Sequence, residues 1–175
     1  MGKSKGSITT RELAIFAMLG AIMYLSKLMM EWLPNIHLLG MFTMTYTIVY
    51  RKKALIPIYV YVLINGLFAG FSLWWVPYLY IWTILWGITM LLPKNMNNKM
   101  KIVVYATVCG LHGLSFGTLY APAQAILFGL NFKGMMAWIV AGLPFDVAHC
   151  IGDVLASLLI IPLTKVLKKL KYMNI

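Results

Sequence analysis

The chain has 175 residues, of which 62% are hydrophobic and 11% are charged, and its formal net charge is +11. A soluble domain carries about a quarter charged residues, so this composition excludes an ordinary soluble protein and predicts an all-α integral membrane protein. The alternating segments of about ten residues that are typical of a transmembrane β-barrel are absent. Lysines and arginines cluster between the apolar runs, which favours a multi-pass membrane protein over a nucleic-acid-binding protein.

The first apolar run predicts a membrane span at about residues 12–31. Ala14, Ala17 and Ala21 form a ridge of small residues along this span. Such a ridge lets the backbone of another helix approach closely. The partner helix could belong to this protein's own bundle or to another subunit.

The next two spans are predicted at about 36–50 and 54–71, and three polar residues in or before them are singled out here. Lys27 and Glu31 lie four residues apart at the end of the first span, a spacing that favours an ion pair. Glu31 is also a candidate ligand-binding residue. Asn65, in the second half of the third span, is a second polar candidate.

Aromatic residues gather at the beginning of the fourth span, which is predicted at about 78–92. Trp75, Tyr78 and Trp82 lie where the third and fourth spans meet one membrane surface. They could form the aromatic belt that many membrane proteins place at the interface. They could instead form a wall on which a planar ligand stacks, because aromatic faces bind flat rings well.

The second half of the chain predicts a fifth span at about 102–119 and a long final element at about 135–168. The apolar segment between them, 120–134, is interrupted by proline and glycine, which predicts an external loop or a short re-entrant helix. Gln124 in this segment is a candidate polar contact for a ligand. The final element is too long for one crossing, and we expect a break near 142–144, where Gly-Leu-Pro occurs.

Charge supports a count of six spans with both termini in the cytoplasm. This topology leaves only Lys27 and Lys133 of the fifteen cations outside the cytoplasmic segments. The cytoplasmic cations are Lys3, Lys5, Arg11, Arg51, Lys52, Lys53, Lys94, Lys99, Lys101, Lys165, Lys168, Lys169 and Lys171. With this orientation, the polar and aromatic candidates converge on the outer half of the membrane.

Two of the four acidic residues lie in the final element, with a histidine between them. Asp146, His149 and Asp153 are spaced i, i+3 and i+7, so a helix places them on one face. An ionisable residue at membrane depth is costly unless it faces a cavity or a partner, which makes this stripe a candidate site. Asp146 could instead cap the first turn of its helix, and His149 could be a satisfied buried group.

Several classes of chemistry lack their sequence signals. No phosphate-binding loop is complete, so we expect no ATPase activity in this chain. HExxH, GxSxG and paired metal-ligand spacings are absent, and Cys109 and Cys150 form no CxxC pair. The sequence therefore predicts neither a metal site nor a cofactor.

The whole chain resembles the substrate-binding S components of energy-coupling factor (ECF) transporters, which take up vitamins and micronutrients in prokaryotes. The resemblance is carried by the chain length, the six predicted spans, the alanine ridge and the basic loops. It is carried most strongly by His112-Gly113, Tyr120-Ala121-Pro122 and the segment 142–149, which are similar to one branch of this superfamily.

The resemblance implies a high-affinity site for a vitamin-like molecule, in a multi-pass protein of the prokaryotic cell membrane. It also implies that the alanine ridge packs on a membrane scaffold (T) subunit driven by two cytoplasmic ATPases. Two other classes stay open at this stage. One is an intramembrane enzyme that uses Asp146, His149 and Asp153 as an acid–base set, and the other is a structural membrane subunit that binds no ligand.

Overall fold

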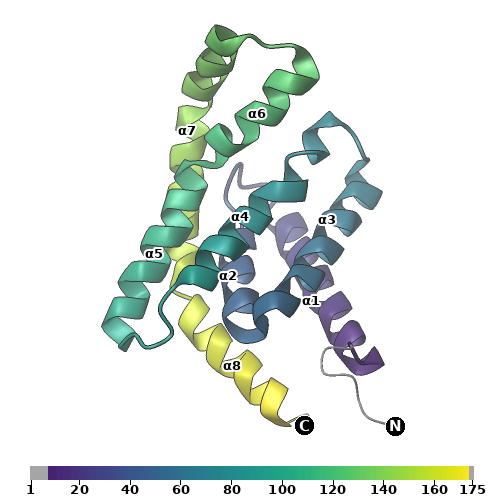
Figure 1. Ribbon diagram of the computed structural model, residues 1–175, viewed down its shortest axis with the longest axis vertical. Helices are drawn as coiled ribbons and strands as arrows, with labels where there is room; N and C mark the ends of the chain where they lie inside the picture. The colour runs from purple at the N-terminus through teal and green to yellow at the C-terminus, as the bar shows by residue number, and fades with distance from the viewer. Residues whose placement is uncertain (1–7, 174–175) are drawn as a thin grey trace.

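A computed structural model describes residues 8–173 of the chain, and within this range the protein is helical and contains no β-strand (Figure 1). The predicted all-α class is therefore confirmed. Lys3 and Lys5, which the sequence assigns to the cytoplasm, lie outside the described residues. The elements are α1 (Thr10–Met29), α2 (Leu39–Tyr50), the 3-10 helix η1 (Arg51–Ala54), α3 (Leu55–Ala69), the 3-10 helix η2 (Leu73–Trp75), α4 (Tyr78–Leu91), α5 (Asn98–Leu114), α6 (Phe116–Phe128), α7 (Phe132–Ser157) and α8 (Ile160–Met173).

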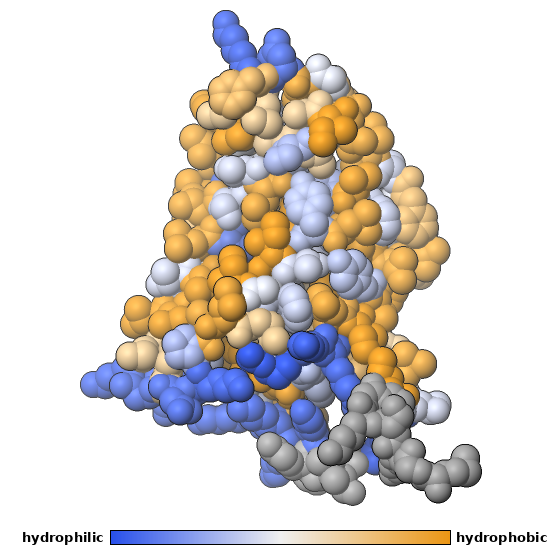
Figure 2. All heavy atoms as spheres, viewed as in Figure 1, coloured by the Kyte–Doolittle hydropathy of each residue, from blue (hydrophilic) through white to orange (hydrophobic). Residues whose placement is uncertain are grey.

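Four helical segments among the described residues are long and apolar enough to cross a membrane: Thr10–Met29, Leu39–Ala69, Asn98–Phe128 and Phe132–Ser157. Large apolar side chains cover the surface between the two ends of the molecule, while hydrophilic residues gather mainly at one end (Figure 2). A surface of this kind is stable only against lipid, because water would face a very large apolar area. Helices of this length and composition indicate a membrane protein.

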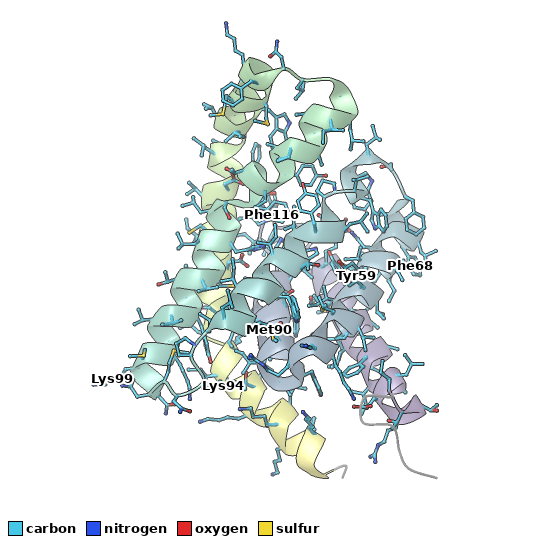
Figure 3. The ribbon with its side chains drawn as sticks, viewed as in Figure 1. Tyr59, Phe68, Met90, Lys94, Lys99 and Phe116 are labelled. Carbon is cyan, nitrogen blue, oxygen red and sulfur yellow. The ribbon has the colours of Figure 1, made fainter. Side chains whose placement is uncertain are left out.

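Helices α1, α3 and α5 run towards one end of the molecule, and α2, α4 and α7 run back (Figure 1). Helix α6 continues in the general direction of α5 and α8 in that of α7, so α1 begins and α8 ends at the same end of the molecule. This end is called the basic end here, because the α2–α3 connection, the α4–α5 loop and α8 supply most of its lysines and arginines. Figure 3 shows Lys94 and Lys99 there. The connection between α6 and α7 forms the opposite end, where Lys133 is exposed.

Helix α1 packs against α3 through a glycine. A methyl group at Gly20 would lie 2.5 Å from the Cγ1 atom of Val60, so only glycine permits this distance between the helices. Ala14 and Ala17 are exposed and Ala21 is half-buried. The alanine ridge therefore faces away from the α1–α3 contact and leaves a close-packing surface on the outside of the bundle.

The predicted break near 142–144 is wrong, because α7 continues through Pro144 to Ser157. Pro144 removes one backbone hydrogen bond, but membrane helices tolerate this loss when neighbouring helices support them. The chain bends instead at residues 158–159, just before α8. Pro162 explains this position, since it lies in the first turn of α8 and its ring would clash with the Leu158 carbonyl in a continuous helix.

The segment 120–134 is mostly helical rather than a loop. Helix α6 runs from Phe116 to Phe128 and contains Pro122. Gly129 then adopts a left-handed conformation with φ 65°, which ends the helix at little cost because glycine has no Cβ. The Asn131 side chain accepts a hydrogen bond from the Gly134 N–H at 2.8 Å and caps α7. Residues 116–157 thus form a helical hairpin.

Helices α5 and α7 approach each other closely at Gly113. A methyl group at this position would lie 2.9 Å from the Asp153 Oδ2 atom and 2.9 Å from the backbone carbonyl carbon of His149. The backbone carbon cannot move aside without shifting α7. Glycine at position 113 therefore fixes the spacing of the two helices.

We predict that Gly113→Ala lowers the free energy of unfolding by about 1–3 kcal/mol, because the added methyl group overpacks the α5–α7 contact. Gly142→Ala is the matched control, since a methyl group at position 142 meets no atom within 4 Å. The control should be neutral or slightly stabilising, as expected for alanine in a helix. Thermal unfolding of both variants in one detergent tests this, and equal melting temperatures would contradict it.

Candidate functional site

The polar stripe of α7 faces the interior of the bundle. Asp146, His149 and Asp153 are 2%, 6% and 2% exposed, whereas Val147 and Ile151 on the other side of the helix are exposed. The prediction that these three residues share one buried face is confirmed. Their side chains therefore meet other helices rather than lipid, and those neighbours determine what the stripe can do.

The Asp146 side chain caps the beginning of α6 and not of its own helix, α7. Its Oδ1 atom accepts a hydrogen bond from the backbone N–H of Gly117, in the first turn of α6, at 2.8 Å. The cap of α7 itself is Asn131, so the predicted capping of its own helix is wrong: Asp146 lies in the middle of α7. The Ser115 side chain, at the N-cap of α6, makes no capping bond. A carboxylate there complements the free N–H groups and the helix dipole.

His149 forms a direct pair with a histidine from the loop between α1 and α2. The Nε2 atoms of His149 and His37 lie 3.0 Å apart. One of these nitrogens must donate and the other accept, so at least one of the two imidazoles is neutral. The Nδ1 atoms of both rings are buried and have no hydrogen-bond partner among residues 8–173. The pair therefore presents two further polar atoms to its surroundings.

Aromatic rings surround the two histidines. The Trp82 ring is almost fully buried, and its centroid lies 5.9 Å from that of His37 and 5.7 Å from that of His112. Phe116, near the centre of Figure 3 where α5 meets α6, has its ring centroid 4.7 Å from that of His149. Tyr78 completes the group, with its ring centroid 6.0 Å from that of Trp82. Residues far apart in the sequence thus line one small region with flat faces.

Asp153 lies about two turns from Asp146 towards the basic end, pressed between two helix backbones. A methyl group at Gly40 of α2 would lie 2.9 Å from the Asp153 Oδ1 atom, and one at Gly113 of α5 would lie 2.9 Å from Oδ2. The two glycines therefore make room for the carboxyl group. Oδ1 is buried and has no hydrogen-bond partner in the protein.

Helix α3 adds two buried polar side chains. Tyr61 and Asn65 lie one turn apart and are both fully buried. The Tyr61 ring packs edge-on against Trp82, with centroids 6.2 Å apart. The Tyr61 hydroxyl and both polar atoms of the Asn65 amide lack a hydrogen-bond partner in the part of the chain that the structure describes.

We call these residues the interior polar cluster. Its members are His37, Tyr61, Asn65, Trp82, His112, Asp146, His149 and Asp153. Each has a buried polar atom that no group of the described residues satisfies. Burying such an atom without a hydrogen bond costs about 1–3 kcal/mol. Because so many of these atoms occur in the interior of one bundle, the cluster is the candidate ligand-binding site.

The other predicted site residues lie outside this cluster. The Trp75 indole N–H donates to the Val62 carbonyl at 2.8 Å, so its polar atom is already satisfied. Glu31 is exposed and pairs with Lys27, with an N–O distance of 3.7 Å, which confirms the predicted ion pair. Gln124 is half-buried on α6, about two turns beyond the residue that Asp146 caps.

Four residues of the site have no individual signal in the sequence. His37 and His112 are isolated from the Asp-His-Asp spacing and join it only through the fold. Tyr61 and Phe116 are two of many aromatic residues in apolar segments. One signal could have found the histidines: the chain has only three, and all lie in or beside apolar runs.

Among residues 8–173, no group of three or more histidine, cysteine or acidic side chains is arranged to hold a metal ion. No protein-family model, curated protein or solved structure matches the chain. The interpretation of the site therefore rests on its own geometry.

We predict that Asp146→Ala lowers the free energy of unfolding by about 1–3 kcal/mol, since the Gly117 N–H loses its charged partner. Asp146→Asn should cost less, because an amide oxygen can still accept the hydrogen bond. Hydrogen–deuterium exchange of α6 peptides and thermal unfolding measure the two effects. Asp153→Ala is the control, because Asp153 makes no hydrogen bond within the described residues. Unchanged exchange in α6 of Asp146→Ala would contradict the assignment.

Proposed function

We propose that this protein is the substrate-capture subunit of an ATP-driven importer of the ECF type, and that the interior polar cluster binds the transported molecule. The single observation that supports this most is the set of buried polar atoms, unpartnered within the described residues, on four helices and the α1–α2 loop. A membrane protein keeps costly polar groups in its interior when they serve a ligand or a transport path.

The chemistry of the cluster describes the ligand in outline. Asp146 and Asp153 offer hydrogen-bond acceptors, and the Trp82 indole N–H offers a donor. The rings of Trp82 and Phe116 pack against each other, with centroids 6.0 Å apart, and together suit a flat molecule that lies beside them. A small, planar, vitamin-like compound with several polar atoms fits these requirements.

The importer would be completed by other subunits. Ala14 and Ala17 are exposed on α1 and provide a surface for close packing with a membrane scaffold subunit. This chain contributes no complete phosphate-binding loop, so the energy would come from a pair of cytoplasmic ATPases. The proposal also places both termini and the basic end in the cytoplasm of a prokaryotic cell, in a six-span topology, following the positive-inside rule.

We predict that Trp82→Phe lowers ligand binding roughly tenfold or more, with a moderate loss of thermal stability because the smaller ring leaves a cavity in the core. The variant keeps an aromatic ring but removes an indole N–H that no protein group accepts, so only a ligand would lose a hydrogen bond. Trp32→Phe, at an exposed position, is the matched control. The measurement is mass spectrometry of small molecules released from gently purified protein, together with a melting curve.

Each outcome of this experiment is informative. A single stoichiometric metabolite in the wild type and in Trp32→Phe, but little in Trp82→Phe, supports capture by the cluster. Equal amounts in all three proteins would contradict the assigned site. A wild type without any bound molecule counts against high-affinity capture and favours a structural subunit. Turnover of a substrate by the purified chain without partners would favour the intramembrane enzyme.

We predict that Ser72→Cys reacts with a membrane-impermeant maleimide on intact cells, whereas Lys99→Cys reacts only after permeabilisation. With six spans these positions lie on opposite sides. Lys133→Cys is the positive control for outside labelling, and Cys109 and Cys150 are replaced by alanine in all variants. Equal labelling of Ser72→Cys and Lys99→Cys would contradict six spans.

A further inference from the structure

A cleft at the basic end lies apart from the interior polar cluster. It has a volume of about 290 Å³ and lies between α2, α4, α5 and α8. Five cationic side chains line it, each from a different part of the chain or a different turn of a helix. They are Arg51, Lys94, Lys101, Lys165 and Lys168.

No carboxylate side chain balances these five charges. The chain has four acidic residues, and none of them lines the cleft. Glu12 and Glu31 pair with Lys53 and Lys27, and the two aspartates belong to the interior polar cluster. Like charges held together repel one another, so an anion between them would stabilise this arrangement.

Arg51 is fixed in a backbone conformation that is rare for arginine. Its φ angle is +54°, a region that residues with a Cβ adopt at some energetic cost. Two hydrogen bonds hold it there. Its Nη2 atom donates to the Met90 carbonyl at 2.9 Å, and the Trp86 indole N–H donates to the Arg51 carbonyl at 3.1 Å. One guanidinium donor is used in this way, and others of the five are left for an anion in the cleft.

The cleft also has an apolar part and an apolar border. Ile48, Leu92 and Ile161 line it together with the cations. Leu91 and Ile102 are exposed on α4 and α5, and each is the sequence neighbour of a residue that lines the cleft, Leu92 and Lys101. This surface faces lipid in the membrane. A molecule bound here could therefore place an anionic group inside the cleft and a hydrocarbon chain along the apolar surface outside it.

We propose that this cleft binds the phosphate headgroup of an anionic phospholipid from the cytoplasmic leaflet. Basic pockets between membrane helices on this side are suited to such headgroups. The volume of the cleft accommodates a headgroup, while the acyl chains lie along Leu91 and Ile102. The proposal is independent of substrate capture, because it concerns another site and another ligand class.

The test is native mass spectrometry of the full-length protein titrated with dioleoyl phosphatidylglycerol, with dioleoyl phosphatidylcholine as the neutral comparison. The cleft variant is Lys94→Gln with Lys165→Gln. The matched control is Lys99→Gln with Lys169→Gln, which removes the same charge from exposed positions outside the cleft. We expect phosphatidylglycerol binding to fall on the order of tenfold or more in the cleft variant and little in the control.

Two results would overturn the proposal. An equal loss of phosphatidylglycerol binding in both double variants would mean that only the general charge of the basic end attracts lipid. Displacement of the lipid by millimolar glycerol 3-phosphate or inorganic phosphate would identify a soluble phosphate compound as the ligand instead. All variants should first give the same circular dichroism spectrum and elution volume as the wild type, so that a loss of binding reports the cleft.

Discussion

The close approach of α5 and α7 is the constraint on which the interior of this protein depends. Glycine at position 113 lets the two helices come so near that Asp153 is pressed against both α5 and α2. At the same level of α7, His149 reaches the loop histidine His37. A larger residue at position 113 would separate the helices and the polar groups together. Packing and the candidate site therefore share one structural cause.

Asp146 connects the same interior to the helical hairpin at the opposite end. One of its oxygens holds the first turn of α6, and the other has no partner in the protein. A ligand that donated a hydrogen bond to the second oxygen would share the negative charge of the carboxylate with the N-terminus of α6. The carboxylate thus belongs to the fold and to the candidate site at once, and replacing it affects both.

The sequence predicted the general fold well because hydrophobicity and charge act over whole segments. The helical class, the buried face of Asp146, His149 and Asp153, and the Lys27–Glu31 pair all follow from spacing along a single helix. The break in the final element was misplaced because two prolines offer similar local signals. Pro144 lies inside α7, which continues past it. The chain bends at residues 158–159, just before the helix turn that contains Pro162.

The site was predicted only in part because its contacts join distant segments. Spacing on α7 could identify His149, but nothing local relates it to His37, 112 positions earlier in the chain. Trp75 and Trp82 look alike in the sequence. In the fold, a carbonyl of α3 satisfies the first, and the second is buried among histidines with a free N–H. Tertiary packing makes this distinction, and composition does not.

The burial of the interior polar cluster determines how a bound molecule could enter and leave. Helix α7 has 26 residues and is about 39 Å long, more than the roughly 30 Å of a bilayer's hydrocarbon, so it tilts or extends beyond it. Asp146 lies about 21 Å from its beginning and about 16 Å from its end, near the middle of the helix. A molecule held there is separated from water on both sides by packed side chains. It can enter or leave only when helices move apart, so the rate of that separation sets how long it stays bound.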